Sequence, residues 1–494
     1  MSFKQSNEIK PRSFAELLAL GFFTPHSSGI QIDLNVAWAK ESRKGTALLP
    51  MREGHICDHN CTLHSEVNPD GGGYACPAAY TLRENRGLDP RSLVSVPDIL
   101  TGIRIAATGL ESLRQQFLDR LKDLGYSQEI IDGIAEGPSL PEINLFGGNP
   151  EMHPHIHEII AQLTRDGYSL TLTTTGKKFL TNAEFVRKMQ EHLPTRIALS
   201  ADDLPSDGFE IRRLATLSQA DLRTEYKKIS PTAGQKQKAI EAISVLNLSR
   251  QDSNFPPIIL NFVLHPGNIE KALEMMQQLG ELYPNTHFNP YPAQSAFSRE
   301  SLILTSHQVR ILEQIIDGVI ERHFTQLEGP TDFKVVPRLH YHLLLKAMFL
   351  AYPGNARRIS EVLSGYGLWR CYEDPVLTLR YLQIGAGDAH ALPIVSSGDQ
   401  KKPSPGGHPG CFWNSETVTD AEITVWNSTP QQVKRHLTAG IQQLVEKSQS
   451  PCPGCGFPRL VFDEPSVVAG IPHEAEDNLV LTNYLMLRKK YGGY

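Results

Sequence analysis

The middle of the chain alternates between two patterns of apolar and polar positions. Short runs that are apolar or β-branched at nearly every position are typical of buried parallel strands. Longer runs with apolar residues three or four positions apart are typical of helices that pack on a sheet. The segments predicted as strands are 141–150, 168–176, 195–203, 256–268 and 287–293. The segments predicted as helices are 153–167, 182–193, 234–248, 269–283 and 306–323.

Strand and helix follow one another in strict turn, and this order predicts a parallel sheet covered by helices. We therefore expect an α/β fold, a partial parallel (β/α)6 barrel of the TIM type. Parallel barrels carry their functional residues at the carboxyl ends of the strands. Polar residues and glycines gather at those ends here: Gly147, Gly148, Asn149, Thr174, Thr175, Ser200, Asp202, Asn261 and Asn289.

Flanking segments divide the chain further. Residues 1–45 do not follow the barrel pattern and contain a short amphipathic stretch, SFAELLALGFF, predicted to be a helix. The barrel is assigned to 46–325. Two bridging helices are predicted in 326–370, and a C-terminal domain in 371–494. Several glycines and prolines in that last segment are typical of loops.

Composition narrows the function classes. The chain has 494 residues and a formal net charge of −6, which gives no reason to expect a nucleic-acid or anionic-membrane partner. No stretch approaches the roughly 20 apolar residues of a transmembrane helix, and the N-terminus lacks the apolar run of a secretory signal. We expect a cytoplasmic protein, in which clustered thiols bind metal or do redox work more often than they form disulfides.

The cysteines fall into two groups. Cys57, Cys61 and Cys76 lie in a polar, glycine-rich loop near the start, and four more lie near the end: Cys371, Cys411, Cys452 and Cys455. Four thiolates can close the shell of a cubane iron–sulfur cluster or of a zinc ion, whereas three leave one iron of a cubane open. His64 is an alternative third ligand of the first group. Idle, buried thiols are the simplest other interpretation.

The ordered motifs resemble the radical S-adenosylmethionine (radical SAM) superfamily. FGGNP, with Gly147, Gly148 and Asn149, resembles the Gly-Gly-Glu-Pro strand end of that family. TLTTTG resembles the following strand of that family, ALSADD the strand end that faces the SAM ribose, and NPYPA the last barrel strand, which lies near the adenine. The chain departs from the family in its stretched cysteine loop, in Ala75 before the last cysteine, and in Asn149, which stands where the usual residue is Glu.

The resemblance implies a cofactor and a chemistry. A [4Fe-4S] cluster on Cys57, Cys61 and Cys76 would be chelated by SAM and, once reduced, cleave it to a 5′-deoxyadenosyl radical that abstracts a substrate hydrogen atom. The implied SAM-binding residues are Gly147, Gly148, Asn149, Thr174, Ser200, Asp202, Asn261 and Asn289. No residue is assigned a catalytic role.

The second cysteine group resembles the auxiliary-cluster domains of these enzymes, called SPASM or twitch. Cys452 and Cys455 form a Cys-x2-Cys knuckle, and Gly406 stands five residues before Cys411, as in the Gly-x4-Cys element of those domains. This implies an auxiliary [4Fe-4S] cluster on Cys371, Cys411, Cys452 and Cys455. A zinc ion on the same thiolates is the alternative.

The expected partners are a peptide or small-molecule substrate and an electron donor such as a flavodoxin or ferredoxin. The competing hypothesis from another class is a zinc-stabilised scaffold or binding protein with an inactive barrel. Anaerobic colour and iron content separate the two hypotheses.

Overall fold

A computed structural model describes residues 29–33, 96–111, 114–123, 128–138, 140–146, 150–201, 208–229, 234–292, 304–337, 354–363, 369–371, 381–385 and 460–462, with the helical positions 339, 342, 345, 346 and 349. The fold below is that of these residues. No helix among them is both long and apolar enough to cross a membrane.

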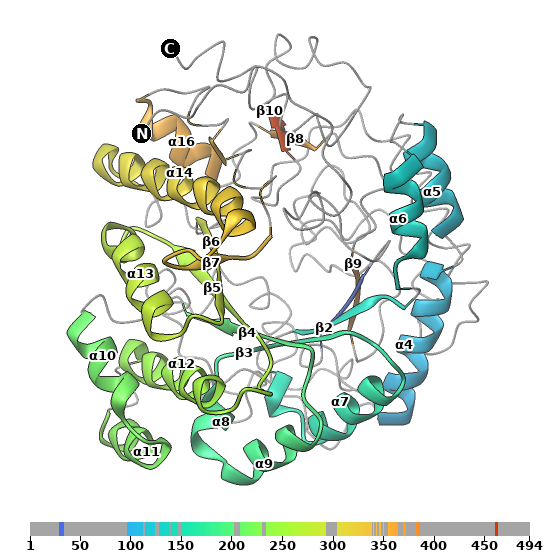
Figure 1. The fold of residues 1–494 in the computed structure, drawn as a ribbon, viewed down its shortest axis with the longest axis horizontal. Coiled ribbons are helices and arrows are strands. Elements are labelled where there is room, and N and C mark those ends of the chain that lie inside the picture. The colour runs from blue at the N-terminus through green and yellow to red at the C-terminus, as the bar shows by residue number, and fades with distance from the viewer. Residues whose placement is uncertain are drawn as a thin grey trace, which may run out of the picture.

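An eight-stranded sheet forms the centre of the molecule (Figure 1). Its strand order is β7-β6-β5-β4-β3-β2-β1-β9, and every neighbouring pair is parallel. From β1 to β7 the order in space is the order in sequence, which is the winding of a barrel rather than of a doubly wound sheet. The strands are β1 (Gly29–Asp33), β2 (Glu142–Phe146), β3 (Leu170–Thr174), β4 (Arg196–Ser200), β5 (Ile258–Leu264), β6 (Thr286–Pro292), β7 (Lys334–Val335) and β9 (Tyr381–Gly385).

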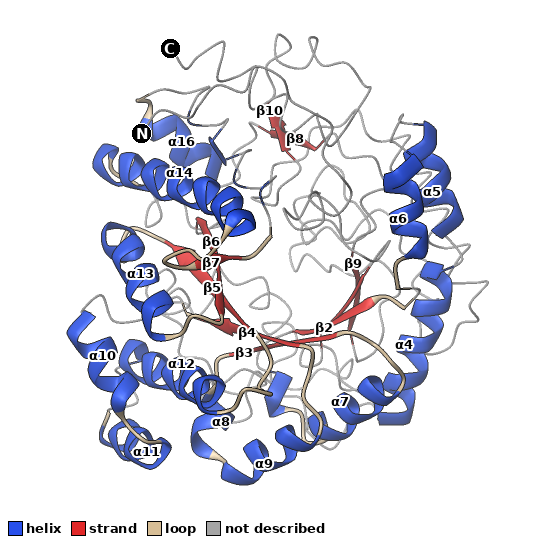
Figure 2. Cartoon of the chain, viewed as in Figure 1, coloured by secondary structure: helices blue, strands red, loops and turns tan. Residues whose placement is uncertain are grey.

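Helices lie along the convex side of the curved sheet, as Figure 2 shows. Most of them lie between consecutive strands in the chain, as in βαβ units. The helices are α4 (Val96–Glu111), α5 (Arg114–Asp123), α6 (Gln128–Glu136), α7 (Ile156–Arg165), α8 (Lys177–Thr181), α9 (Ala183–Glu191), α10 (Gly208–Thr216), α11 (Gln219–Lys228), α12 (Gly234–Gln251), α13 (Ala272–Leu282), α14 (Ser306–Glu328) and α16 (Ala356–Leu363). Short 3-10 turns η2 (Pro150–Met152) and η3 (Ile269–Lys271) precede α7 and α13.

The core lies between the sheet and these helices. Alternate residues of each strand, such as Leu145, Leu172, Leu199 and Leu260, are fully buried against the helix layer. Met275 and Met276 of α13 belong to the same apolar cluster. Because successive strand residues point to opposite faces, the remaining positions face the concave side of the sheet.

All five predicted strands and all five predicted helices are present, so the α/β class and the parallel sheet are confirmed. Three further strands of the sheet come from segments outside the predicted barrel: β1 lies within 1–45, β7 within 326–370 and β9 within 371–494. Strands β1 and β9 pair with each other at one edge of the sheet. The predicted helix 13–23 lies outside the described residues.

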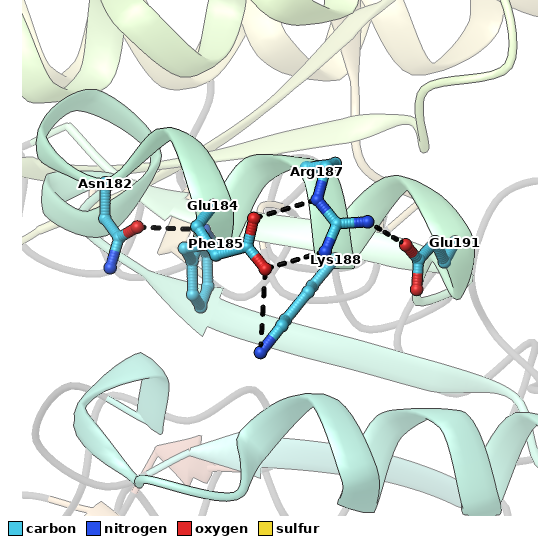
Figure 3. A network of polar contacts seen from close by, with 6 residues as sticks. All are labelled: Asn182, Glu184, Phe185, Arg187, Lys188 and Glu191. Atoms are coloured by element: carbon cyan, nitrogen blue, oxygen red, sulfur yellow. Dashed lines mark hydrogen bonds and ion pairs between the residues drawn. The ribbon is translucent and has the colours of Figure 1, made fainter.

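Local signals in the sequence explain where helices begin. Asn182 caps α9, because its side-chain oxygen accepts a hydrogen bond from the Phe185 amide at 3.0 Å. Figure 3 shows this cap and the ladder of Glu184, Arg187 and Glu191 on the exposed face of the helix. Such exposed pairs at helical spacing stabilise a helix by a few tenths of a kcal/mol.

One glycine allows close packing of helix and sheet. Gly280 of α13 lies against the start of β7, where an added Cβ would come within 2.4 Å of the Asp332 carbonyl oxygen and 2.6 Å of the Phe333 Cβ. A larger residue would push α13 away from the strand. The glycine therefore sets the distance between this helix and the sheet edge.

Candidate functional site

The concave face of the sheet is polar. In a closed barrel these positions usually hold branched apolar side chains that fill the interior. Here the described inward positions are mostly hydrophilic: Glu142, Asn144, Thr171, Thr173, Arg196, Ser200, Asn261, His287, Asn289 and Lys334. Such a face can bind a polar ligand far more readily than it can form a dry core.

Three of the predicted SAM-binding residues lie side by side on this face. Ser200, Asn261 and Asn289 are register partners on β4, β5 and β6. The Asn289 Nδ2 donates a hydrogen bond to the Asn261 Oδ1 at 2.8 Å, which fixes the orientation of both amides. Their spacing along the chain gave no direct sign of this contact, and the parallel pairing of β5 with β6 produces it.

Thr174 is placed differently. Its hydroxyl donates a hydrogen bond to the carboxylate of Glu151 at 2.6 Å and accepts one from the Gly176 amide at 2.9 Å. It has the same parity as the buried Leu170 and Leu172, so it lies on the helix side of β3. These contacts favour a structural role, and contact of Thr174 with SAM stays a prediction.

The next residue has an unsatisfied group. Thr175 is 3% exposed, and its hydroxyl oxygen is buried without a hydrogen-bond partner in the part of the chain that the structure describes. It follows β3 at the level of Ser200, as the pairing of Thr174 with Leu199 dictates. An orphaned hydroxyl here is available to a ligand at the carboxyl edge of the sheet.

Glu151 is a residue that the motifs did not indicate. It is fully buried in η2, two positions after Asn149, and it also accepts a hydrogen bond from the Lys178 amide at the start of α8. The carboxylate thus joins η2, β3 and α8 immediately beside the predicted glycine turn. A buried charge with such partners is favourable at the N-terminus of a helix.

The three alternating histidines face different surroundings. His153 is 2% exposed, and burial together with the nearby His155 and Lys178 lowers its pKa to about 4. His155 is exposed, whereas His157 is half-buried against the ring of Phe185. Burial and the nearby Lys188 lower the pKa of His157 too.

A second polar group lies near the amino ends of the strands. Glu142 accepts a hydrogen bond from Thr171 and forms an ion pair with Arg196 at 3.0 Å. His287 and Lys334 are register partners on β6 and β7. Burial, Lys334 and Arg196 lower the pKa of His287, so its imidazole is neutral near pH 7. The alternation of polar and apolar residues in EINLF, RIALS and HFNPYP could have indicated these positions.

The described residues include little of the cysteine groups. Most of the predicted ligands and several predicted SAM contacts lie outside them: Cys57, Cys61, Cys76, Cys411, Cys452, Cys455, Gly147, Gly148, Asn149 and Asp202. His64 is also outside them. Among the described residues there is no group of three His, Cys, Asp or Glu side chains that could hold a metal ion.

Chain connectivity nevertheless places constraints on both groups. Cys57, Cys61 and Cys76 lie in the sequence between the end of β1 and the start of α4. Cys371 ends β8 (Trp369–Cys371), which pairs antiparallel with β10 (Leu460–Phe462). Its direct partner is Leu460, five residues after Cys455.

Comparisons with known proteins give little further guidance. No protein-family profile matches the chain, and no curated protein matches it. Two solved structures resemble part of it. One is described as "Structure of TYW1 with a lysine-pyruvate adduct bound": it is 16% identical, the match covers 42% of this chain and 58% of that one, and the TM-score is 0.24. The other, "Crystal structure of archaeal TYW1", is 13% identical over 47% of this chain and 67% of that one, with a TM-score of 0.25. Likenesses this weak identify neither a fold nor an activity.

Proposed function

We propose that the chain is a radical SAM enzyme, which uses a [4Fe-4S] cluster on Cys57, Cys61 and Cys76 and abstracts a hydrogen atom from a peptide or small-molecule substrate. The observation that carries the proposal is topological. In the sequence, three cysteines lie between β1 and β2, the first two strands of a sequentially wound parallel sheet. The polar row of Ser200, Asn261 and Asn289 lies toward the carboxyl edge of that sheet.

The described residues at this edge fit the uncharged half of SAM. The Ser200 hydroxyl and the fixed amides of Asn261 and Asn289 offer donors and acceptors for a ribose or an adenine edge. The unpartnered Thr175 hydroxyl offers another group at the same level. When bound, SAM and the reduced cluster supply a 5′-deoxyadenosyl radical.

The protein's own contribution is positioning. The Asn261–Asn289 hydrogen bond keeps both amides in one orientation before a ligand arrives, which reduces the entropy lost on binding. Glu151 anchors η2 to α8, and η2 directly follows Gly147, Gly148 and Asn149 in the chain. A fixed η2 would limit the motion of backbone groups that these residues are proposed to present to the methionine end of the cofactor.

The second cysteine group extends the proposal to an auxiliary [4Fe-4S] cluster on Cys371, Cys411, Cys452 and Cys455. Its support is the pairing of β8 with β10, because β10 follows the Cys452–Cys455 knuckle closely in sequence. A fully extended chain covers about 3.5 Å per residue, so five residues keep Cys455 within reach of the strand that ends in Cys371. A flavodoxin or ferredoxin would supply the electron.

The test is anaerobic reconstitution of the full-length protein. We expect a brown protein with about eight irons, four in each cubane, which produces 5′-deoxyadenosine from SAM under a strong reductant. Changing Cys57, Cys61 and Cys76 together to Ala should remove about four irons and all SAM cleavage.

The matched control changes Cys371, Cys411, Cys452 and Cys455 to Ala. This variant should also lose about four irons but keep some reductive cleavage of SAM without substrate. A colourless protein that holds one zinc and never releases 5′-deoxyadenosine would overturn the proposal in favour of a scaffold. If His64 is needed for the first cluster and Cys76 is not, the third ligand is His64.

A further inference from the structure

Near the amino ends of the strands, the concave face holds a group of basic side chains. The acidic side chains described beside them are too few to balance their positive charge. Lys334 begins β7 and is the register partner of His287 on β6. Its neighbour Val335 is fully buried in the apolar cluster on the helix side, so Lys334 lies on the concave face. Arg196, at the start of β4, lies on that face too.

The charges of this group do not balance among the described residues. Glu142 is the acidic side chain that contacts the group, and it is already engaged by Arg196 at 3.0 Å and by Thr171. Lys334 is half-buried and has no hydrogen bond or ion pair within the described part of the chain. His287 is near enough to both cations for them to lower its pKa.

Cations are seldom left half-buried without a partner. A partly buried cation beside a second cation is stabilised when an opposite charge binds next to it. Inward positions of a closed parallel barrel are usually occupied by branched apolar side chains, which fill the interior. A lysine at such a position does not improve the packing. The arrangement instead resembles a site prepared for an anion that arrives from outside.

We infer that Lys334 and His287 form an oxyanion subsite, which binds a carboxylate or phosphate group of the enzyme's substrate. Lys334 offers a point charge and the neutral His287 a ring N–H, while the guanidinium of Arg196, which is paired with Glu142, adds positive charge on the same face. Calling the ligand a substrate depends on the proposed function, whereas the binding of an anion does not.

The position of the subsite suits a substrate that meets a cofactor at the carboxyl edge. His287 precedes Asn289 by two residues on β6, and both face the concave side. With a rise of about 3.4 Å per residue, the two side chains lie roughly 7 Å apart along the strand. A small molecule whose anionic group is held at His287 can therefore extend its other end toward the row of Asn261 and Asn289.

The experiment measures binding of simple anions to purified full-length protein without added SAM or reductant. Inorganic phosphate is the first probe and succinate the second, each at low ionic strength, where electrostatic binding is least screened. Calorimetry gives the affinity, and NMR of 15N-histidine-labelled protein follows the His287 ring, assigned with the His287→Gln variant. We expect one of the two anions to bind at one site and to raise the pKa of His287.

Variants then test the residues. Lys334→Met should weaken that binding at least tenfold, whereas Lys334→Arg should retain most of it because the charge remains. Lys227→Met, at an exposed position on α11, is the matched control and should bind like the wild type. Circular dichroism and the melting temperature of each variant exclude unfolding as the cause.

The outcomes separate the two proposals. Phosphate binding without succinate binding assigns a phosphorylated substrate, and the reverse assigns a carboxylate. If neither anion perturbs His287 in the wild type, or if Lys334→Met binds as tightly as the wild type, the subsite does not exist. None of these binding experiments depends on the iron–sulfur cluster. If the protein fails to cleave SAM, the proposed function is overturned, but the conclusion about anion binding at Lys334 and His287 is unaffected.

Discussion

Glu151 and Thr174 are joined by a 2.6 Å hydrogen bond from the threonine hydroxyl to the buried carboxylate. The other carboxylate oxygen accepts from the Lys178 amide. One side chain thus links the turn after β2, the end of β3 and the first turn of α8. The first of these elements directly follows Gly147, Gly148 and Asn149 in the sequence.

Replacing Glu151 by Ala should destabilise the protein strongly. Two buried donors, the Thr174 hydroxyl and the Lys178 amide, would lose their acceptor, and each unsatisfied buried group costs about 1–3 kcal/mol. We expect the free energy of unfolding, measured in urea, to fall by about 2–4 kcal/mol. The control is Glu158→Ala on α7, where the side chain is 62% exposed. If both variants lose equally little, the Glu151 contact is not structural.

Asn289→Ala should weaken SAM binding without unfolding the protein. The change removes the amide that the Asn261 carbonyl oxygen holds in place, at the level where an adenine or ribose edge is proposed to bind. We expect the Kd for SAM, measured by anaerobic equilibrium dialysis, to rise about tenfold, equivalent to about 1.4 kcal/mol. Asn285→Ala, in the exposed turn before β6, should leave the Kd unchanged. Equal affinities in all three proteins would exclude Asn289 from the cofactor site.

Gly280→Ala tests the close packing of α13 on β7. Alanine favours a helix over glycine by about 1 kcal/mol, but the added Cβ would overlap the Asp332 carbonyl oxygen. Overpacking of this kind costs about 1–3 kcal/mol, so we expect a net loss of thermal stability. Gly329→Ala, whose added Cβ would meet nothing within 4 Å, should change the melting temperature little. A Gly280→Ala protein as stable as the wild type would contradict the packing.

His153 predicts a dependence of stability on pH. Its pKa is about 4 in the folded protein and 6.5 when unfolded. Below pH 6.5 the unfolded chain binds a proton that the folded protein does not, so stability is lost as the pH falls from 6.5 toward 4. A difference of this size corresponds to about 3 kcal/mol.

The measurement compares urea unfolding at pH 7 and pH 4. His153→Gln should lose about 3 kcal/mol less than the wild type over this interval. His192→Gln, at an exposed position, should lose as much as the wild type. An identical pH dependence in all three proteins would mean that His153 is accessible to protons in the folded state.

The sequence predicts the strands whose signals are local. Buried parallel strands such as β3 and β5 consist of consecutive apolar or β-branched residues, and the helix caps, such as Asn182, follow from side-chain chemistry. By contrast, the pairing of β1 with β9 joins residues 29–33 with 381–385. No periodicity within a window of the sequence can indicate a pairing over that separation.

The candidate site was also predictable only where its residues give a local signal in the sequence. Asn261 and Asn289 stand out as polar residues within apolar strands, and their side-by-side arrangement follows once the strands are parallel. Glu151 and Lys334 do not stand out, because carboxylates and lysines in a sequence are by default exposed. Their importance arises from burial and from neighbours on other strands, which only the tertiary structure provides.

The pairing of β1 with β9 also affects how the protein can be made. While the chain is being synthesised, β1 leaves the ribosome early, but the strand that covers its outer edge comes hundreds of residues later. Until then β1 has an open edge, which can pair with another nascent chain. A protein truncated before residue 381 would keep that open edge permanently. Such fragments should aggregate even if every barrel helix folds, and full-length expression should benefit from slow growth and chaperones.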